Sequence, residues 1–396
     1  MKAQAALLVC LIVSLFLYTD STTAVTGIEE GREEIQDMKE DQIENVNISE
    51  IRKYWENIEG EYGAFLPESQ KGSLKEFITG EKQFAPKEWG MAFLQYIFHE
   101  VTANGKLMGT LLILAVFSAV LKAVQNAFET EVVNKAAYAV VFLVFIVIAL
   151  NSFYLAMDYV KDTVGSMVHF MIALLPLMLA LLATSGAAAS SALFHPLVVF
   201  LVQSSGMLIE NIILPLLFFS AILSVVSSLN EHIKLTKLAE LLRRTAMGIL
   251  AVFFTIFLGV ISVQGATTAV TDGVAIRTAK FIAGNFVPVI GRVFTDAADT
   301  ALGASVLLKN TVGLAGLAIL FLLCAFPAIK VLVISFIFHF TAALVQPLGD
   351  GPLLEALSVL GKTVLSMFAA LAAVSFMFFL ALTLIVVSGN ISLMVR

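Results

Sequence analysis

Seven long apolar runs constrain the fold of this 396-residue chain more than any other feature. They lie at residues 106–121, 136–157, 167–189, 195–228, 245–266, 311–346 and 364–388. About 20 apolar residues in a helix cross a bilayer, and a helix satisfies its own backbone groups there. The runs 195–228 and 311–346 exceed one span, so each is either a hairpin or one tilted helix. We therefore predict an all-α, polytopic helical membrane protein with about seven to nine spans.

The first 24 residues are typical of a secretory signal peptide. Lys2 precedes an apolar core from Ala5 to Leu17, and small or polar residues follow as far as Ala24. This core is short for a span of about 20 residues. We expect cleavage near Ala24, which would place the next segment outside the cytoplasm; an uncleaved anchor is the alternative.

Residues 25–100 form an acidic head. Val25–Gly90 holds 16 acidic and 8 basic residues, a net charge of −8, whereas Met91–Arg396 holds 13 and 15, a net of +2. The part before residue 50 has the composition of a disordered segment. From Ile51 onward, apolar residues recur at helical spacing, which predicts a small extracytoplasmic helical region that packs on the membrane surface or on another protein. The acidic balance argues against nucleic acid as a partner.

Residues 271–305 separate a first membrane region (101–270) from a second (306–396). Their polar and helix-breaking residues recur every three or four positions, as in a helix with one polar face. Pro288 and Gly291 favour two short helices with a bend. We predict an amphipathic segment that does not span the membrane, with a face toward a partner or the membrane surface made by Arg277, Lys280, Arg292, Asp296 and Asp299.

Lysine and arginine in short loops indicate the orientation of the spans. Asn230–Thr245 is the most basic loop and is expected in the cytoplasm. We expect a loop at Asp158–Asp162 on the opposite side. A hairpin through 195–228 places 271–305 outside, whereas a single span there reverses that side. A second hairpin through 311–346, with Lys330 at its inner tip, places Arg396 in the cytoplasm.

No catalytic or metal-binding pattern is recognisable in the sequence. The five histidines are scattered, and a chain cleaved near Ala24 keeps only Cys324 of its two cysteines. Neither a phosphate-binding glycine loop nor a nucleophile elbow is present. We therefore predict a protein that is not an enzyme and that needs no cofactor.

Polar residues within the apolar runs are the better candidates for a functional site. Glu210 and Asn211 interrupt 195–228, and Lys330 interrupts 311–346. Charges are costly in lipid and usually face water or a partner, so an ion pair between Glu210 and Lys330 would satisfy both. The alternative is that each residue marks a hairpin tip near the headgroups.

Several longer motifs carry a family resemblance. They are LPESQKGSL (66–74), FHEVTANGKLMGTL (98–111), FHP (194–196), FTIFLGVISVQGA (254–266), TDGVAIRTAKFIAGNFVPVIGRVFTDAADT (271–300), LLKNTVG (307–313), AFPAIKVL (325–332) and QPLGDGP (346–352). From about Trp55 to the C-terminus, the chain resembles the stage III sporulation protein AE family of endospore-forming bacteria.

The resemblance implies a multi-pass protein of the mother-cell-derived membrane around the forespore. It implies membership in a secretion-like channel complex that links the two cells and is required for forespore development and late forespore gene expression. The implied partners are the other stage III sporulation A-operon proteins and, indirectly, stage II sporulation protein Q, besides the lipid bilayer; a homo-oligomer stays open. The resemblance implies no catalytic residue.

The alternative function is that of an independent secondary transporter of a small solute or ion. Midplane charges and broken helices suit that class, which is built from inverted repeats. We find no convincing internal repeat, and the channel subunit is the favoured hypothesis.

Overall fold

A computed structural model describes residues 49–67, 85–127, 131–185, 187–229, 234–286, 291–348 and 351–394. They belong to one compact unit, Asn47–Arg396. The predicted signal peptide and the first part of the acidic head lie outside the described residues, as do the side chains of residues 266–302.

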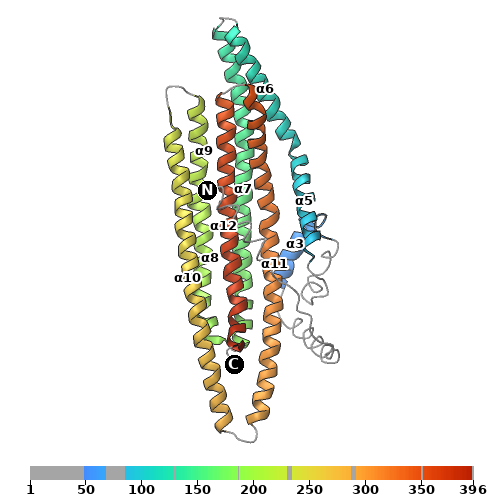
Figure 1. The fold of residues 1–396 in the computed structure, drawn as a ribbon, viewed down its shortest axis with the longest axis vertical. Helices are drawn as coiled ribbons and strands as arrows, with labels where there is room; N and C mark the ends of the chain where they lie inside the picture. The colour runs from blue at the N-terminus through green and yellow to red at the C-terminus, as the bar shows by residue number, and fades with distance from the viewer. Residues whose placement is uncertain are drawn as a thin grey trace. The chain divides into compact units, whose positions relative to one another are not determined.

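Within the described ranges every regular element is a helix, and the all-α membrane fold is confirmed. The helices are α3 (Ser49–Tyr62), α5 (Pro86–Ala103), α6 (Gly105–Ala127), α7 (Glu131–Thr184), α8 (Ala188–Leu208), the π-helix η2 (Ile209–Ile213), α9 (Leu214–Leu229), α10 (Thr236–Phe286), α11 (Gly291–Val345), the 3-10 helix η3 (Gln346–Leu348) and α12 (Pro352–Met394). Figure 1 shows the long helices running side by side.

The predicted number of spans is wrong. Five helical stretches of the described chain are long and apolar enough to cross a membrane, or six if the bent pair α5 and α6 counts as one span. The five are Ala139–Thr184, Pro196–Ser228, Thr236–Gly265, Ser305–Val345 and Pro352–Ser388.

Two kinds of error explain the difference. The expected loop at Asp158–Asp162 lies inside α7, because charged residues alone do not interrupt backbone hydrogen bonding. The expected hairpin in 311–346 is one helix, in which Pro327 and Lys330 are interior residues. Proline removes one backbone hydrogen bond, and a helix that is supported by neighbours continues through it. The run 195–228 is likewise one helical path through α8, η2 and α9.

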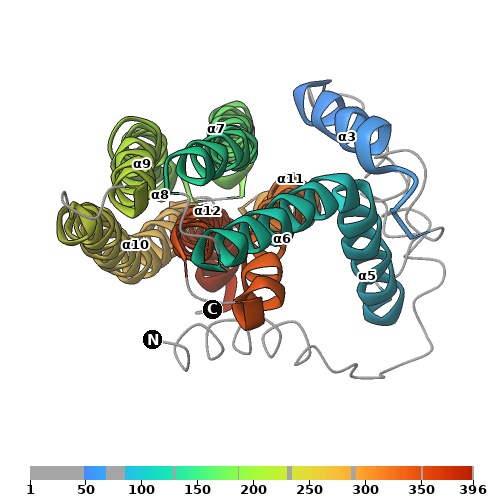
Figure 2. The same ribbon diagram turned by 90° about the horizontal axis from the view of Figure 1, so that it is seen from above.

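Helix α12 lies at the centre of the bundle, as the view from above shows (Figure 2). It packs against α11, α7, α10 and α9. Glycines allow its closest approach to α11: a Cβ atom at Gly361 would lie 2.6 Å from Nδ1 of His339, and Ser335 Oγ donates to the Gly361 carbonyl at 2.9 Å. Small residues at these positions let the two backbones approach closely.

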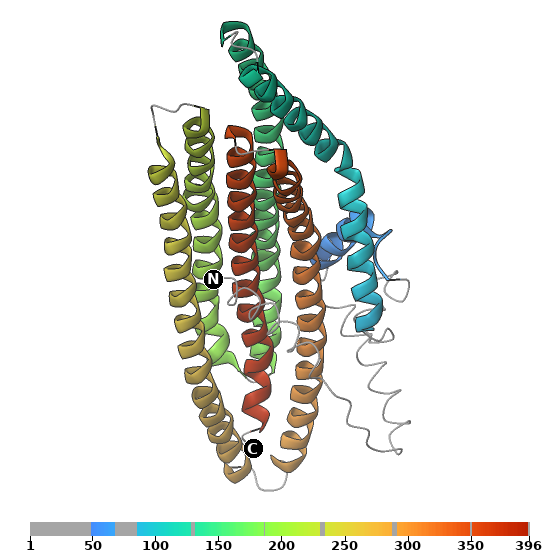
Figure 3. The ribbon, with the colours of Figure 1, turned by 45° about the horizontal axis from the view of Figure 1, so that its top comes forward.

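The helices of the head pack on the body of the same chain. Helix α3 contacts α7 and α11, while α5 contacts α11 and leads into α6 through a bend of 46° (Figure 3). Pro86 begins α5, where its missing N–H costs no hydrogen bond. Asn104 ends α5 by donating from Nδ2 to the carbonyl of Glu100 at 2.9 Å.

The backbone of residues 271–305 extends α10 as far as Phe286 and begins α11 at Gly291. The two helical pieces are therefore ends of long helices rather than short separate ones. Their predicted surface role stays a prediction, because the side chains of Arg277, Lys280, Arg292, Asp296 and Asp299 lie outside the described part of the structure.

Candidate functional site

One face of α3 is apolar and buried. Ile51, Trp55, Ile58 and Tyr62 follow one another at intervals of three or four residues, and all four are buried. Arg52 and Glu56 occupy the opposite, exposed face. The buried face meets α7 and α11, as the edge-on contact between Tyr54 and Phe170 at 5.1 Å illustrates.

An aromatic cluster joins α3 and α5 to α11 around Phe326. The ring of Tyr62 stacks on that of Phe326, with centroids 4.3 Å apart and 7° between the planes. The ring of Tyr96, from α5, meets Phe326 edge-on at 4.9 Å. Phe93 approaches the same ring at 5.7 Å. Such offset and edge-on pairs add about 0.5–1.5 kcal/mol each beyond the area that they bury.

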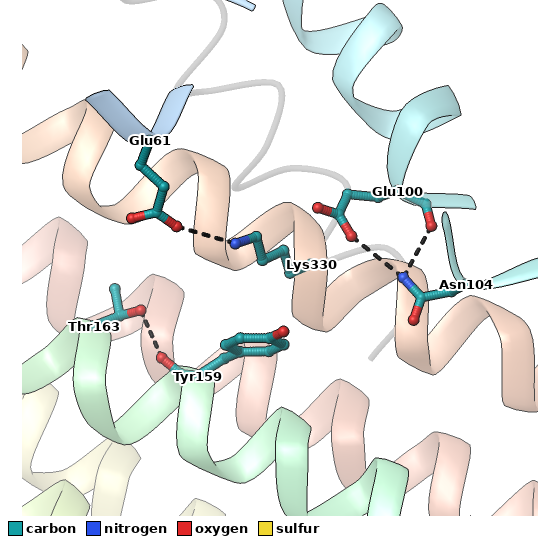
Figure 4. A network of polar contacts seen from close by, with 6 residues as sticks. All are labelled: Glu61, Glu100, Asn104, Tyr159, Thr163 and Lys330. Carbon is teal, nitrogen blue, oxygen red and sulfur yellow. Dashed lines mark hydrogen bonds and ion pairs between the residues drawn. The ribbon is translucent and has the colours of Figure 1, made fainter. Parts of the chain in front are cut away.

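Lys330 lies one helical turn after Phe326 and faces the same cluster. Its Nζ is 3.2 Å from Oε1 of Glu61, and it lies 5.2 Å and 5.3 Å from the ring centroids of Tyr62 and Tyr159. Both ring distances are within the range of a cation–π interaction. Figure 4 shows the ammonium between the Glu61 carboxylate and the Tyr159 ring. Three helices, α3, α7 and α11, thus converge on one cation.

The C-terminal end of α3 strengthens the attraction of this site for the Lys330 ammonium. Glu61 and Tyr62 are its last two residues, and its last turn carries no basic residue of its own. The carbonyl groups at a helix C-terminus carry partial negative charge, which a cation stabilises. Burial, followed by the neighbouring Glu61, raises the pKa of Tyr62 above its usual range. The Tyr62 ring therefore stays neutral while it faces the ammonium.

Comparison with known proteins gives the family. Residues 69–389 match the family described as stage III sporulation protein AE. The chain belongs to this family. It is 55% identical over 368 residues to Stage III sporulation protein AE of Bacillus subtilis (strain 168), covering 93% of this chain and 92% of that protein. No solved structure matches the chain. The resemblance seen in the sequence is confirmed, and with it a role in sporulation and a location in a membrane.

The intramembrane candidates of this family member fall in two places. Lys330 lies in the site described above and pairs with Glu61, not with Glu210 as the sequence suggested. Glu210 and Asn211 lie in η2, where Glu210 Oε1 would be 3.6 Å from a Cβ atom at Gly165 of α7. All three residues lie inside helices, so none marks a hairpin tip.

Sequence reasoning missed Glu61, Tyr62, Tyr159 and Phe326 as members of one site. The helical spacing of α3 did single out its buried face, and Phe326 one turn before Lys330 was a usable signal. Tyr159 is not recognisable as a member, because the sequence predicts a loop at Asp158–Asp162. Nothing local pairs Glu61 with Lys330, since 269 positions separate them.

The site attaches α3 to the body of the protein through an apolar face and one ion pair. Burial of each large apolar side chain of α3 contributes about 1.5–3 kcal/mol, whereas an ion pair with an exposed partner contributes about 0–1 kcal/mol. Lys330 keeps only 18% of its side-chain surface exposed, and Glu61 keeps 60%. The apolar face therefore supplies most of the stabilisation of this contact, and the ion pair of Lys330 with Glu61 adds a smaller part at the end of α3. Among the described residues, no three His, Cys, Asp or Glu side chains are grouped to hold a metal ion.

Proposed function

We propose that this chain is a non-catalytic, membrane-embedded subunit of a secretion-like channel complex that links mother cell and forespore. It acts in the mother-cell-derived membrane around the forespore, in forespore development and late forespore gene expression. Family membership is the observation that carries the proposal. The polytopic fold, and a head whose helices pack on the body of the chain, are compatible with a structural subunit.

Within this proposal the helix ends at 271–305 meet the other stage III sporulation A-operon proteins and, through them, stage II sporulation protein Q. The five charges at Arg277, Lys280, Arg292, Asp296 and Asp299 lie at helical spacing beside the break between α10 and α11. Charged residues at a protein interface contribute to specificity more than to raw affinity.

Replacing these five charges by serine tests the proposal. We expect normal amounts of protein in the membrane, because all five positions lie outside the apolar stretches that can cross it. Recovery of the other stage III sporulation A-operon proteins in co-purification should fall at least about tenfold, which corresponds to about 1.4 kcal/mol, and heat-resistant spores should fall with it.

The matched control replaces Arg52 and Glu56, on the exposed face of α3, by serine. We expect this variant to co-purify and to sporulate normally. Undiminished co-purification of the fivefold variant would contradict the proposal, as would an equal loss in the control.

A further inference from the structure

A polar cavity of about 760 Å³ opens where α9 ends and where α10 and α12 begin. It is lined by four serines of α9, Ser220, Ser224, Ser227 and Ser228, and by residues from the first turns of α10 and α12. Cavities of about 300–1,000 Å³ are typical of sites for small molecules and cofactors. This cavity is separate from the site around Lys330.

Positive charge predominates around the cavity. Lys234, Arg243 and Lys362 line it, against Glu240 and Glu355. Glu240 also accepts a hydrogen bond from Arg244, which lies outside the lining. The remaining excess of lysine and arginine suits an anion, and a phosphate is the anion that such side chains bind best.

One hydroxyl in the wall is available for a ligand. Ser220 donates to the Ala239 carbonyl at 2.6 Å, and Ser227 lies 3.0 Å from the Thr236 hydroxyl. Ser224 lines the same wall and keeps 7% of its surface exposed. Its hydroxyl can donate to an oxygen atom in the cavity.

The cavity lies at the level of lipid headgroups. The apolar stretches of three helices begin or end beside it, at Ser228, Thr236 and Pro352.

Large apolar side chains are exposed along these helices, both near the cavity (Phe219, Leu241 and Phe336) and farther from it (Phe200, Val252 and Leu314). An exposed apolar surface of this extent marks contact with a membrane or with another protein.

We propose that the cavity binds the phosphate group of an anionic phospholipid headgroup. Lys234, Arg243 and Lys362 would surround the phosphate oxygens, and the Ser224 hydroxyl would donate to one of them. The cavity site does not depend on the proposed function.

Native mass spectrometry of the full-length chain, released from nanodiscs of phosphatidylcholine with added phosphatidylglycerol, tests the proposal. We expect retained phosphatidylglycerol to fall about tenfold when Arg243 and Lys362 are both replaced by glutamine, and less when only Ser224 is replaced by alanine. Lys237→Gln, an exposed position of α10 outside the lining, should leave retention within about twofold of the parent.

Retention that is equal in the parent and in both cavity variants would overturn the proposal. Displacement of phosphatidylglycerol by millimolar inorganic phosphate would assign the cavity to a free anion and overturn the lipid assignment. Ser224→Ala removes a single oxygen, so it keeps the test decisive if the double variant does not fold.

Discussion

Replacing Lys330 by glutamate will weaken the docking of α3 on the body of the protein. The new carboxylate would lie beside Glu61, at the negative end of α3 and against two tyrosine rings, where every attraction to the ammonium becomes a repulsion. We expect a loss of about 2–3 kcal/mol in docking, discounted for the exposure of Glu61. Lys330→Met, which only removes the charge, should cost about 1 kcal/mol.

Tryptophan fluorescence measures directly how well α3 is docked on the body. The chain has two tryptophans, and both are buried on helices of the head, Trp55 on α3 and Trp89 on α5. In a Trp89→Phe background, Lys330→Glu should shift the Trp55 emission to longer wavelength as water reaches the indole. Adding Glu61→Lys restores the pair with reversed charges and should recover most of the emission. An unchanged spectrum in Lys330→Glu would show that the pair does not hold α3.

Replacing Gly313 by leucine will destabilise the bundle itself. A Cβ atom at this position would overlap Cγ2 of Val386 on α12 and would lie 3.1 Å from Cε of Met178 on α7. The Cγ2 atom belongs to a β-branched side chain that has little freedom to move, so the helices must separate. Overpacking of this kind costs about 1–3 kcal/mol.

The matched control is Gly259→Leu on α10, where a Cβ atom would meet nothing within 4 Å. Both substitutions remove a helical glycine, which by itself favours the helix by about 1 kcal/mol. In detergent, thermal unfolding of the Gly313 variant should occur at lower temperature than that of the parent, and the control should match or exceed the parent. A Gly313 variant as stable as the control would contradict the close contact of α7, α11 and α12.

The sequence predicted the chemical class of the fold well and its connectivity poorly. Long apolar runs suffice to predict membrane helices, because a helix satisfies its own backbone hydrogen bonds in lipid. It does not show where one helix stops. The sequence predicts boundaries at Lys330 and at Asp158–Asp162, but the helix continues through both because neighbouring helices support its backbone.

The candidate site was predictable only in its parts. Lys330 stood out as a charge in an apolar run, and the face of α3 stood out by its period. Their meeting depends on how α3 folds back over α7 and α11, which no local pattern encodes. The same holds for Ser224 and Lys362. They come from different helices, and only the fold brings them to one cavity.

Sided labelling of two cysteines tests most directly the claim that α11 crosses the membrane once. Thr300 lies near the start of α11 and Glu355 near the start of α12, and the 46 residues from Thr300 to Val345 extend about 69 Å as one helix. Each position is changed to cysteine in a Cys10→Ala, Cys324→Ala background and exposed to an impermeant thiol reagent. We predict that Thr300→Cys and Glu355→Cys are labelled from opposite sides. Labelling of both from the same side would contradict the single crossing.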